Sequence, residues 1–217
     1  PKLTSVDCAK LPEAPLSIDS VPGAKGYHGL AFDDDGHILG SDNNSIIKST
    51  RDGDWDILSP SVGWTEQIER LPDGDLAVLA AQYTNISRIT MKGASSVLAT
   101  SVSAYGMTVG PDGMLYVADY TNIVRIDPKT GDRENLFDFN LNSTSPKVVS
   151  FGLDDHTLYY GSLSGGRIYV VALDEDYNPK GGPEVFAEGV GGWHDGLGVD
   201  VCGNLYVADY NNTALFK

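Results

Sequence analysis

The sequence predicts an all-β fold, a β-propeller built from four-stranded antiparallel blades. One pattern occurs five times: an apolar stretch, a tight turn, a second apolar stretch, a polar turn and a third stretch. The turn glycines Gly36, Gly74 and Gly113 lie 38 and 39 residues apart, and Gly203 follows 90 residues later, at two longer periods. Asp155 takes the turn position in the fourth copy. A period of about 40 residues with several short strands per unit is typical of propeller blades.

The copies divide the chain into five consecutive repeats that form a single domain, 1–217, with a tail at 1–14. The repeats span about 26–61, 62–101, 102–142, 143–190 and 191–217. Outer strands are expected at 55–58, 96–98, 134–139 and 184–187, while the fifth repeat ends with its third strand at 214–217. The alternating stretch 16–21 can supply the missing strand and close a five-bladed ring. The alternative is a six-bladed propeller of which this sequence lacks one blade.

Composition excludes some classes of partner. The chain has 30 acidic and 15 basic residues and a net charge of −15, which argues against nucleic-acid binding. No run of 18 apolar residues occurs, so no membrane-spanning segment is expected. We expect a monomer that binds a small molecule.

The two cysteines lie near opposite ends of the repeat array. Cys8 is in the N-terminal tail and Cys202 is in the turn of the last repeat. A ring that closes through both termini brings them together, which predicts a disulfide; the alternative is two unrelated thiols. A disulfide implies an oxidising compartment, so the protein would be secreted or periplasmic.

One set of equivalent positions is polar and differs in every copy. It lies just before the innermost strand of each blade, which lines the central channel of a propeller. The set consists of His28, Glu66, Tyr105, Lys147 and Asp195. Residues that repeat build the blade, whereas residues that diverge at the axis favour a pocket at the channel mouth. The alternative is that polar residues at a solvated mouth have no function.

The chemistry of this set suggests a metal or hydrolytic site. Asp195 and Glu66 are hard oxygen ligands suited to Ca²⁺ or Mg²⁺. His28 can act as a general base or as a ligand. Tyr105 and Lys147 can bind an oxyanion or a carboxylate, or Lys147 can pair with one of the two acidic residues in a buried salt bridge.

Residues beside this set are further candidates for substrate binding. Trp64 and Trp193 can form apolar walls, and His194 is a weaker candidate because neighbours on a strand point to opposite faces. No GxSxG, HExxH, P-loop or GxGxxG motif is present. The acidic run at 33–36 lacks the spacing of an EF-hand, so it is predicted to be a turn.

Three segments resemble the SMP-30/gluconolactonase/LRE-like propellers: GLAFDDDGHILG, GMTVGPDGMLYVADYTNIVRIDPKTG and HDGLGVDVCGNLYVADYNN. The resemblance covers roughly residues 26–217, and the strand-turn-strand motif is shared with NHL-type and strictosidine-synthase-like propellers. It implies a calcium-dependent lactone hydrolase or related esterase, often six-bladed. Asp195–Gly196 matches the family's Asp-Gly ligand motif. His28 stands where a Glu ligand is expected, and Tyr105 and Lys147 stand where Asn ligands are expected.

Two hypotheses follow. In the first, a divalent cation at Asp195, with Glu66 as a further ligand, polarises a lactone carbonyl while His28 activates water. Here Asp195 and His28 are the catalytic residues. In the second, the protein is a non-catalytic propeller that binds a small molecule or a protein at the same mouth, with a degraded metal site.

Overall fold

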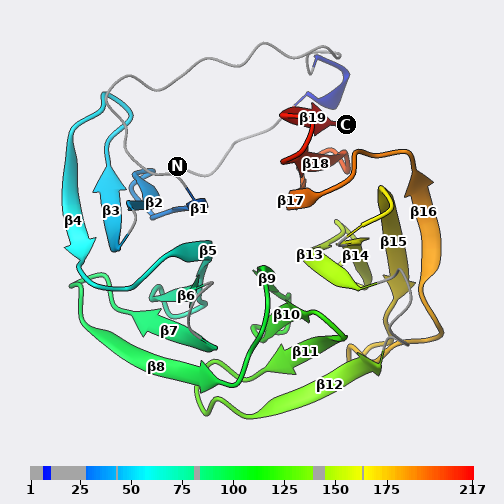
Figure 1. Cartoon of the computed structure of the whole chain (residues 1–217), viewed down its shortest axis with the longest axis horizontal. Helices are drawn as coiled ribbons and strands as arrows, with labels where there is room; N and C mark the ends of the chain where they lie inside the picture. Colours follow the sequence, from blue (N-terminus) through cyan, green and yellow to red (C-terminus); the bar gives the residue numbers. More distant parts are fainter. Residues whose placement is uncertain (1–6, 11–27, 43, 81–83, 139–144, 163) are drawn as a thin grey trace.

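The chain forms a ring of five antiparallel sheets in a computed structural model, which describes residues 7–10, 28–42, 44–80, 84–138, 145–162 and 164–217 (Figure 1). The inner strands β1, β5, β9, β13 and β17 face the centre, and the outer strands lie on the rim. The predicted propeller is therefore confirmed. No helix in the described segments is long and apolar enough to cross a bilayer.

Each sheet is a meander in sequence order. The first blade contains β1 (His28–Phe32), β2 (Ile38–Asp42), β3 (Ser45–Ser49) and β4 (Trp55–Ser59). The second contains β5 (Thr65–Arg70), β6 (Leu76–Ala80), β7 (Asn85–Ile89) and β8 (Ser95–Thr100). The third contains β9 (Gly106–Val109), β10 (Leu115–Asp119), β11 (Asn122–Ile126) and β12 (Arg133–Asp138). The fourth contains β13 (Pro146–Phe151), β14 (Thr157–Ser162), β15 (Arg167–Ala172) and β16 (Glu184–Glu188). The fifth contains β17 (His194–Val199), β18 (Leu205–Asp209) and β19 (Ala214–Phe216).

The turn between the first two strands of each blade explains the repeated glycine. The backbone φ is +80° at Gly36, +92° at Gly74, +79° at Gly113 and +81° at Gly203, a left-handed conformation that glycine adopts without steric cost. Asp155 takes the same conformation, with φ of +60°, in the fourth blade. Aspartate is among the few side chains that tolerate this region. The sequence alignment of the five turns is thus confirmed.

Apolar side chains fill the space between neighbouring blades. Leu39 and Ile46 of the first blade pack with Ile68 and Leu76 of the second, all essentially without solvent exposure. Similar clusters join the second blade to the third and the third to the fourth. Burying each such side chain contributes about 1.5–3 kcal/mol, so the packing between blades holds the ring together.

The fifth sheet has three strands among the described residues. The stretch 16–21, which the sequence offers as its fourth strand, lies outside the described residues, so closure by that strand stays a prediction. The chain ends are joined by a disulfide between Cys8 and Cys202, whose Cα atoms are 5.6 Å apart. Cys8 begins a short 3₁₀ turn (Cys8–Lys10) that lies beside β19 in Figure 1.

Candidate functional site at the channel mouth

The five axial residues meet at one cavity of about 230 Å³. Each comes from a different blade and lies within one residue of the start of its inner strand. The sequence placed the whole set just before these strands, but Glu66, Lys147 and Asp195 are the second residues of theirs. The cavity is lined by His28, Trp64, Glu66, Tyr105, Lys147, Trp193, Asp195 and Tyr210. The structure therefore brings together the predicted set and the two predicted tryptophans, and it adds one tyrosine.

A β-bulge sets the direction of several of these side chains. The pairing register shifts at Glu66 between Thr65 and Gln67, and equivalent shifts occur at Lys147 and Asp195. In the first blade the shift falls one residue later, at Gly29. A bulge leaves its extra residue outside the ladder and re-aims its side chain, so three blades turn a charged residue toward the axis.

Lys147 and Asp195 form an ion pair beneath the mouth. The Lys147 side chain is 1% exposed, and its ammonium nitrogen donates a hydrogen bond to Asp195 Oδ1. The same nitrogen lies 5.0 Å from the ring centroid of Tyr105 and 4.6 Å from that of Trp193. These are cation–π distances. Of the two roles that the sequence left open for Lys147, the structure shows the pairing with an acidic neighbour, and that neighbour is Asp195.

His28 and Glu66 form a second, looser pair at the mouth. His28 Nδ1 is 4.0 Å from Glu66 Oε2, and the side chains are 29% and 14% exposed. The imidazole also packs on Trp64, with ring centroids 5.1 Å apart. Burial raises the pKa of the Glu66 carboxyl; the neighbouring charge of Asp195 raises it further, while His28 and Lys147 act in the opposite direction. The positive groups near Glu66 therefore stabilise its carboxylate less than burial destabilises it.

Two tyrosines belong to the site that the sequence did not single out. Tyr210 lines the cavity directly. Tyr120 donates a hydrogen bond to the hydroxyl of Tyr105 over 2.6 Å. Burial, and the hydrogen bond to Tyr105, raise the pKa of Tyr120. Both follow the repeated triplet Val-Ala-Asp, in VADYTN and VADYNN. The signal that could have found them is this repeated tyrosine, which sits in turns at the same end of the ring as the axial residues.

The loop that carries Trp193 is held by Asp209. The Asp209 carboxylate accepts backbone hydrogen bonds from Gly192 over 2.7 Å and from Trp193 over 3.4 Å. Gly191 makes this possible, since its φ is +66° and a side-chain Cβ there would lie 1.7 Å from Asp209 Oδ2. A buried acid and a glycine thus fix one wall of the cavity.

His194 is placed differently from its neighbour Asp195. It has no solvent exposure, and its Nε2 donates a hydrogen bond to the carbonyl of Val190. The ring packs against Gly161 of the fourth blade, and it is not among the residues that line the cavity. The expectation that it points away from Asp195 agrees with this placement, which does not favour its suggested contact with substrate.

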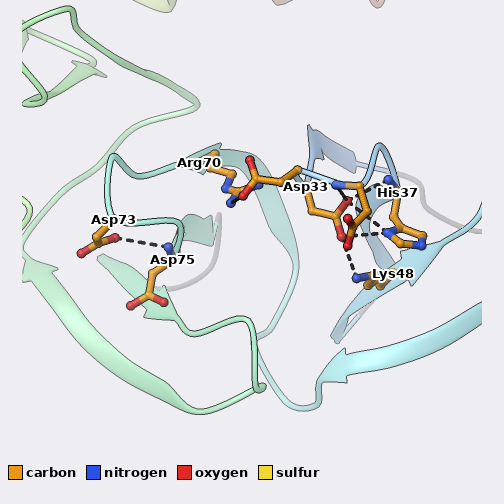
Figure 2. A network of polar contacts seen from close by, with 8 residues as sticks. Asp33, His37, Lys48, Arg70, Asp73 and Asp75 are labelled. Carbon is orange, nitrogen blue, oxygen red and sulfur yellow. Dashed lines mark hydrogen bonds and ion pairs between the residues drawn. The ribbon is translucent and has the colours of Figure 1, made fainter. Parts of the chain in front are cut away.

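The described residues contain one group of three potential metal ligands, and it lies away from the mouth, in the first turn of the first blade. The ligand atoms of Asp33, Asp35 and His37 all lie within 4.8 Å of one another. Asp33 already accepts hydrogen bonds from the backbone N–H groups of Asp35 and His37. It also forms an ion pair with Lys48, whose Nζ lies 2.6 Å from Asp33 Oδ2 (Figure 2). Burial disfavours its ionised form, but these contacts outweigh burial and lower the pKa of Asp33. The acidic run is a turn, as predicted, and its first carboxylate, Asp33, is paired with Lys48.

At the mouth itself, the residues fit a bound divalent cation poorly. The ligand atoms of His28, Glu66 and Asp195 do not form a group within 4.8 Å of one another. Asp195 is paired with the buried ammonium group of Lys147, which supplies a positive charge beside the carboxylate. A cation at Asp195 would lie next to that charge, and like charges at such distances repel strongly in a partly buried site.

Solved structures with the same fold include proteins of different activity. The chain is similar to a gluconolactonase from Xanthomonas campestris, with a TM-score of 0.74 and 19% identity over 86% of this chain and 70% of that one. It is also similar to virginiamycin B lyase from Staphylococcus aureus, with a TM-score of 0.67 and 18% identity over 88% and 69%. A third similar structure is an auxiliary nutrient binding protein from Bacteroides thetaiotaomicron. Its TM-score is 0.70 and its identity is 15%, over 89% of this chain and 55% of that one.

No protein-family model and no curated protein matches the chain in sequence. At these identities the likeness establishes the propeller fold alone. The narrower assignment to the SMP-30/gluconolactonase family stays a prediction.

Proposed function

We propose that the protein hydrolyses a small lactone or ester in the cavity at the channel mouth. The observation that carries the proposal is the position of His28. Its imidazole is partly exposed at the cavity, packs on Trp64 and lies beside the carboxylate of Glu66. An imidazole next to a carboxylate and open to a cavity is the arrangement expected of a general base that activates water.

The proposed reaction uses this pair as follows. His28 Nδ1 faces Glu66, which leaves Nε2 to accept a proton from water as the water oxygen attacks the substrate carbonyl. Glu66 stabilises the imidazolium that forms. The ester C–O bond then breaks, the alkoxide takes the proton from His28, and the products are a carboxylic acid and an alcohol, which remain joined in the case of a lactone. General-base catalysis of this kind contributes about 10²–10⁴-fold.

Lys147 takes the place that a divalent cation would have in the metal-assisted hypothesis. Its ammonium group keeps Asp195 paired and fixed beneath the cavity. Because the mouth residues fit a metal poorly, no step of the proposed reaction passes through one. The gluconolactonase among the similar structures supports hydrolysis on this fold, and in this chain His28 and Glu66 are the residues that would perform it.

A non-catalytic binding propeller is the second candidate. It is favoured by the aromatic walls of the cavity and by the pairing of Lys147, whose charge is already satisfied by Asp195. In this case His28 and Glu66 contact the ligand and move no proton. We also infer that the protein works in an oxidising compartment, since disulfides such as the one between Cys8 and Cys202 form and persist mainly there.

Hydrolysis of a panel of lactones and aryl esters tests the proposal. His28→Gln is expected to lower kcat/KM by about 10²-fold or more. His156→Gln is the matched control: this histidine lies in a turn of the fourth blade, stacked on Tyr177, and does not line the cavity. The same assay in EDTA is expected to show unchanged rates. Turnover that His28→Gln leaves intact would refute the proposed base, and loss of activity in EDTA would restore the metal hypothesis.

A further inference from the structure

The walls and the charges of the mouth cavity identify a ligand class. Four of the eight lining residues are aromatic: Trp64, Tyr105, Trp193 and Tyr210. The remaining polar groups include the carboxylates of Glu66 and Asp195 and one lysine. Aromatic faces combined with carboxylates are the chemistry that recognises an organic cation.

The charge balance of the cavity leaves an excess negative charge. The ammonium group of Lys147 is paired with Asp195 and is almost completely buried, so it is not available to an incoming anion. Glu66 has no lysine or arginine ion-pair partner among the described residues. Its nearest basic group is the imidazole of His28, with Nδ1 4.0 Å from Oε2. Burial raises the pKa of Glu66, and His28 and Lys147 offset this only in part. A cationic ligand would place a positive charge beside Glu66, whereas an anionic ligand would meet the Glu66 carboxylate and find Lys147 already paired with Asp195.

The protein already places one ammonium group, that of Lys147, against the aromatic rings of this cavity. Lys147 Nζ lies at cation–π distance from both Tyr105 and Trp193. Trp64 and Tyr210 offer the same kind of surface to the cavity and are 39% and 68% exposed. The chain also carries a net charge of −15, and a field of that sign concentrates cations at a cleft.

We propose that the natural ligand of the mouth cavity is a small molecule bearing an ammonium group, which lies against the aromatic walls beside Glu66. Resting on the proposed function, this makes the substrate an amine-bearing lactone or ester. The cavity of about 230 Å³ is smaller than the roughly 300–1,000 Å³ of pockets for drug-sized ligands, so the ligand is of small-metabolite size.

Binding is tested first on the unmodified protein. Calorimetric titration compares choline with 3,3-dimethyl-1-butanol, which has the same shape and carries no charge. The expected result is that choline binds about ten-fold more tightly or better, in line with the strength of a desolvated cation–π contact. Equal binding of the two, or no binding of choline, overturns the inference. This comparison needs no variant, so a folding defect cannot obscure it.

Variants then locate the site. Trp64→Leu and Glu66→Gln are each expected to weaken choline binding by about ten-fold. Trp55→Leu is the matched control, because Trp55 is also 39% exposed but lies on β4, outside the mouth cavity. Loss of binding in the Trp55 variant to the same extent as in the Trp64 variant would overturn the location.

Hydrolysis separates this inference from the proposed function. Homoserine lactone carries an ammonium group next to its carbonyl, and α-hydroxy-γ-butyrolactone replaces that group with a neutral hydroxyl. Faster turnover of the first supports both proposals. Equal turnover of the two refutes the cation preference and leaves the hydrolase standing. Turnover of neither, with choline still bound, refutes the hydrolase and leaves cation recognition standing.

Discussion

Replacing Asp195 by asparagine removes the counter-charge of a buried ammonium group. Lys147 is 1% exposed, so it cannot recover hydration when its partner is neutralised, whereas the Asp195 side chain is 29% exposed. Removing one member of a buried pair costs about 3–5 kcal/mol. The asparagine oxygen still accepts a hydrogen bond and the Tyr105 and Trp193 rings remain, so we expect a cost of about 3 kcal/mol for Asp195→Asn.

Replacing the lysine of the pair is expected to lower the free energy of unfolding by less. Lys147→Met keeps the aliphatic packing and leaves a carboxylate that water can reach. We expect Lys147→Met to cost about 1–2 kcal/mol, the usual range for a lost hydrogen bond to a charged group. The two costs should not add, because the double variant leaves no unpaired charge; the expected coupling is about 1–3 kcal/mol.

Thermal melts followed by circular dichroism measure both changes, with urea midpoints as an independent reading. For a chain of this length, each kcal/mol lowers Tm by roughly 2–4 °C, so Asp195→Asn should lower it by about 6–12 °C. The reasoning is refuted if Lys147→Met costs as much as Asp195→Asn. It is also refuted if the double variant shows additive costs within about 0.5 kcal/mol, since the pair would then not be coupled.

Three further outcomes are expected. Reducing the bond between Cys8 and Cys202, which are 194 residues apart, should lower the free energy of unfolding by about 2–5 kcal/mol, as read from melts with and without reductant. Burial raises the pKa of Glu69 from 4.5 to about 7, so the folded protein binds this proton more tightly than the unfolded chain does. The free energy of unfolding therefore falls as pH rises through that range. The urea midpoint of the wild type should be higher at about pH 5 than at about pH 8, and this difference should shrink in Glu69→Gln. Gly191→Ala should abolish ligand binding and lower Tm more than Gly189→Ala, because both have positive φ but only at Gly191 would a Cβ collide with a neighbour; equal effects in the two variants would contradict the proposed wall.

The repeat was sufficient to predict the fold. A period of about 40 residues and a glycine at one turn position gave the blades, and the left-handed φ at Gly36, Gly74, Gly113 and Gly203 explains why that residue recurs. The outer strands also fall where the sequence placed them, within one or two residues. Local patterns of this kind are readable because strand alternation and turn chemistry act over a few residues.

The site was predictable in position but not in detail. The alignment identified the five residues that meet at the mouth, since equivalent positions in a ring lie at the same height on its axis. It did not reveal the bulges at Glu66, Lys147 and Asp195, because a bulge is a property of the register between two strands. It also left open whether Lys147 would pair with Asp195 or Glu66, which depends on the spacing between blades.

Tyr210 and Asp209 were missed for a different reason. Both belong to a motif that repeats, and repeated residues were assigned to the scaffold. Asp209 does serve the scaffold, but its carboxylate holds the backbone of Gly192 and Trp193 and thereby shapes the cavity. A residue can therefore be part of the repeat and still determine the geometry of the site.

The bulges have a consequence for how such a protein diversifies. Glu66, Lys147 and Asp195 lie outside the hydrogen-bonded register of their sheets, so exchanging any of them leaves strand pairing intact. Each of these three blades then offers one position where the side chain can change without disturbing strand pairing, although Lys147 and Asp195 depend on each other and would have to change together. A protein built on this architecture could change its ligand through a few residues at the mouth while the sheets that carry them stay the same.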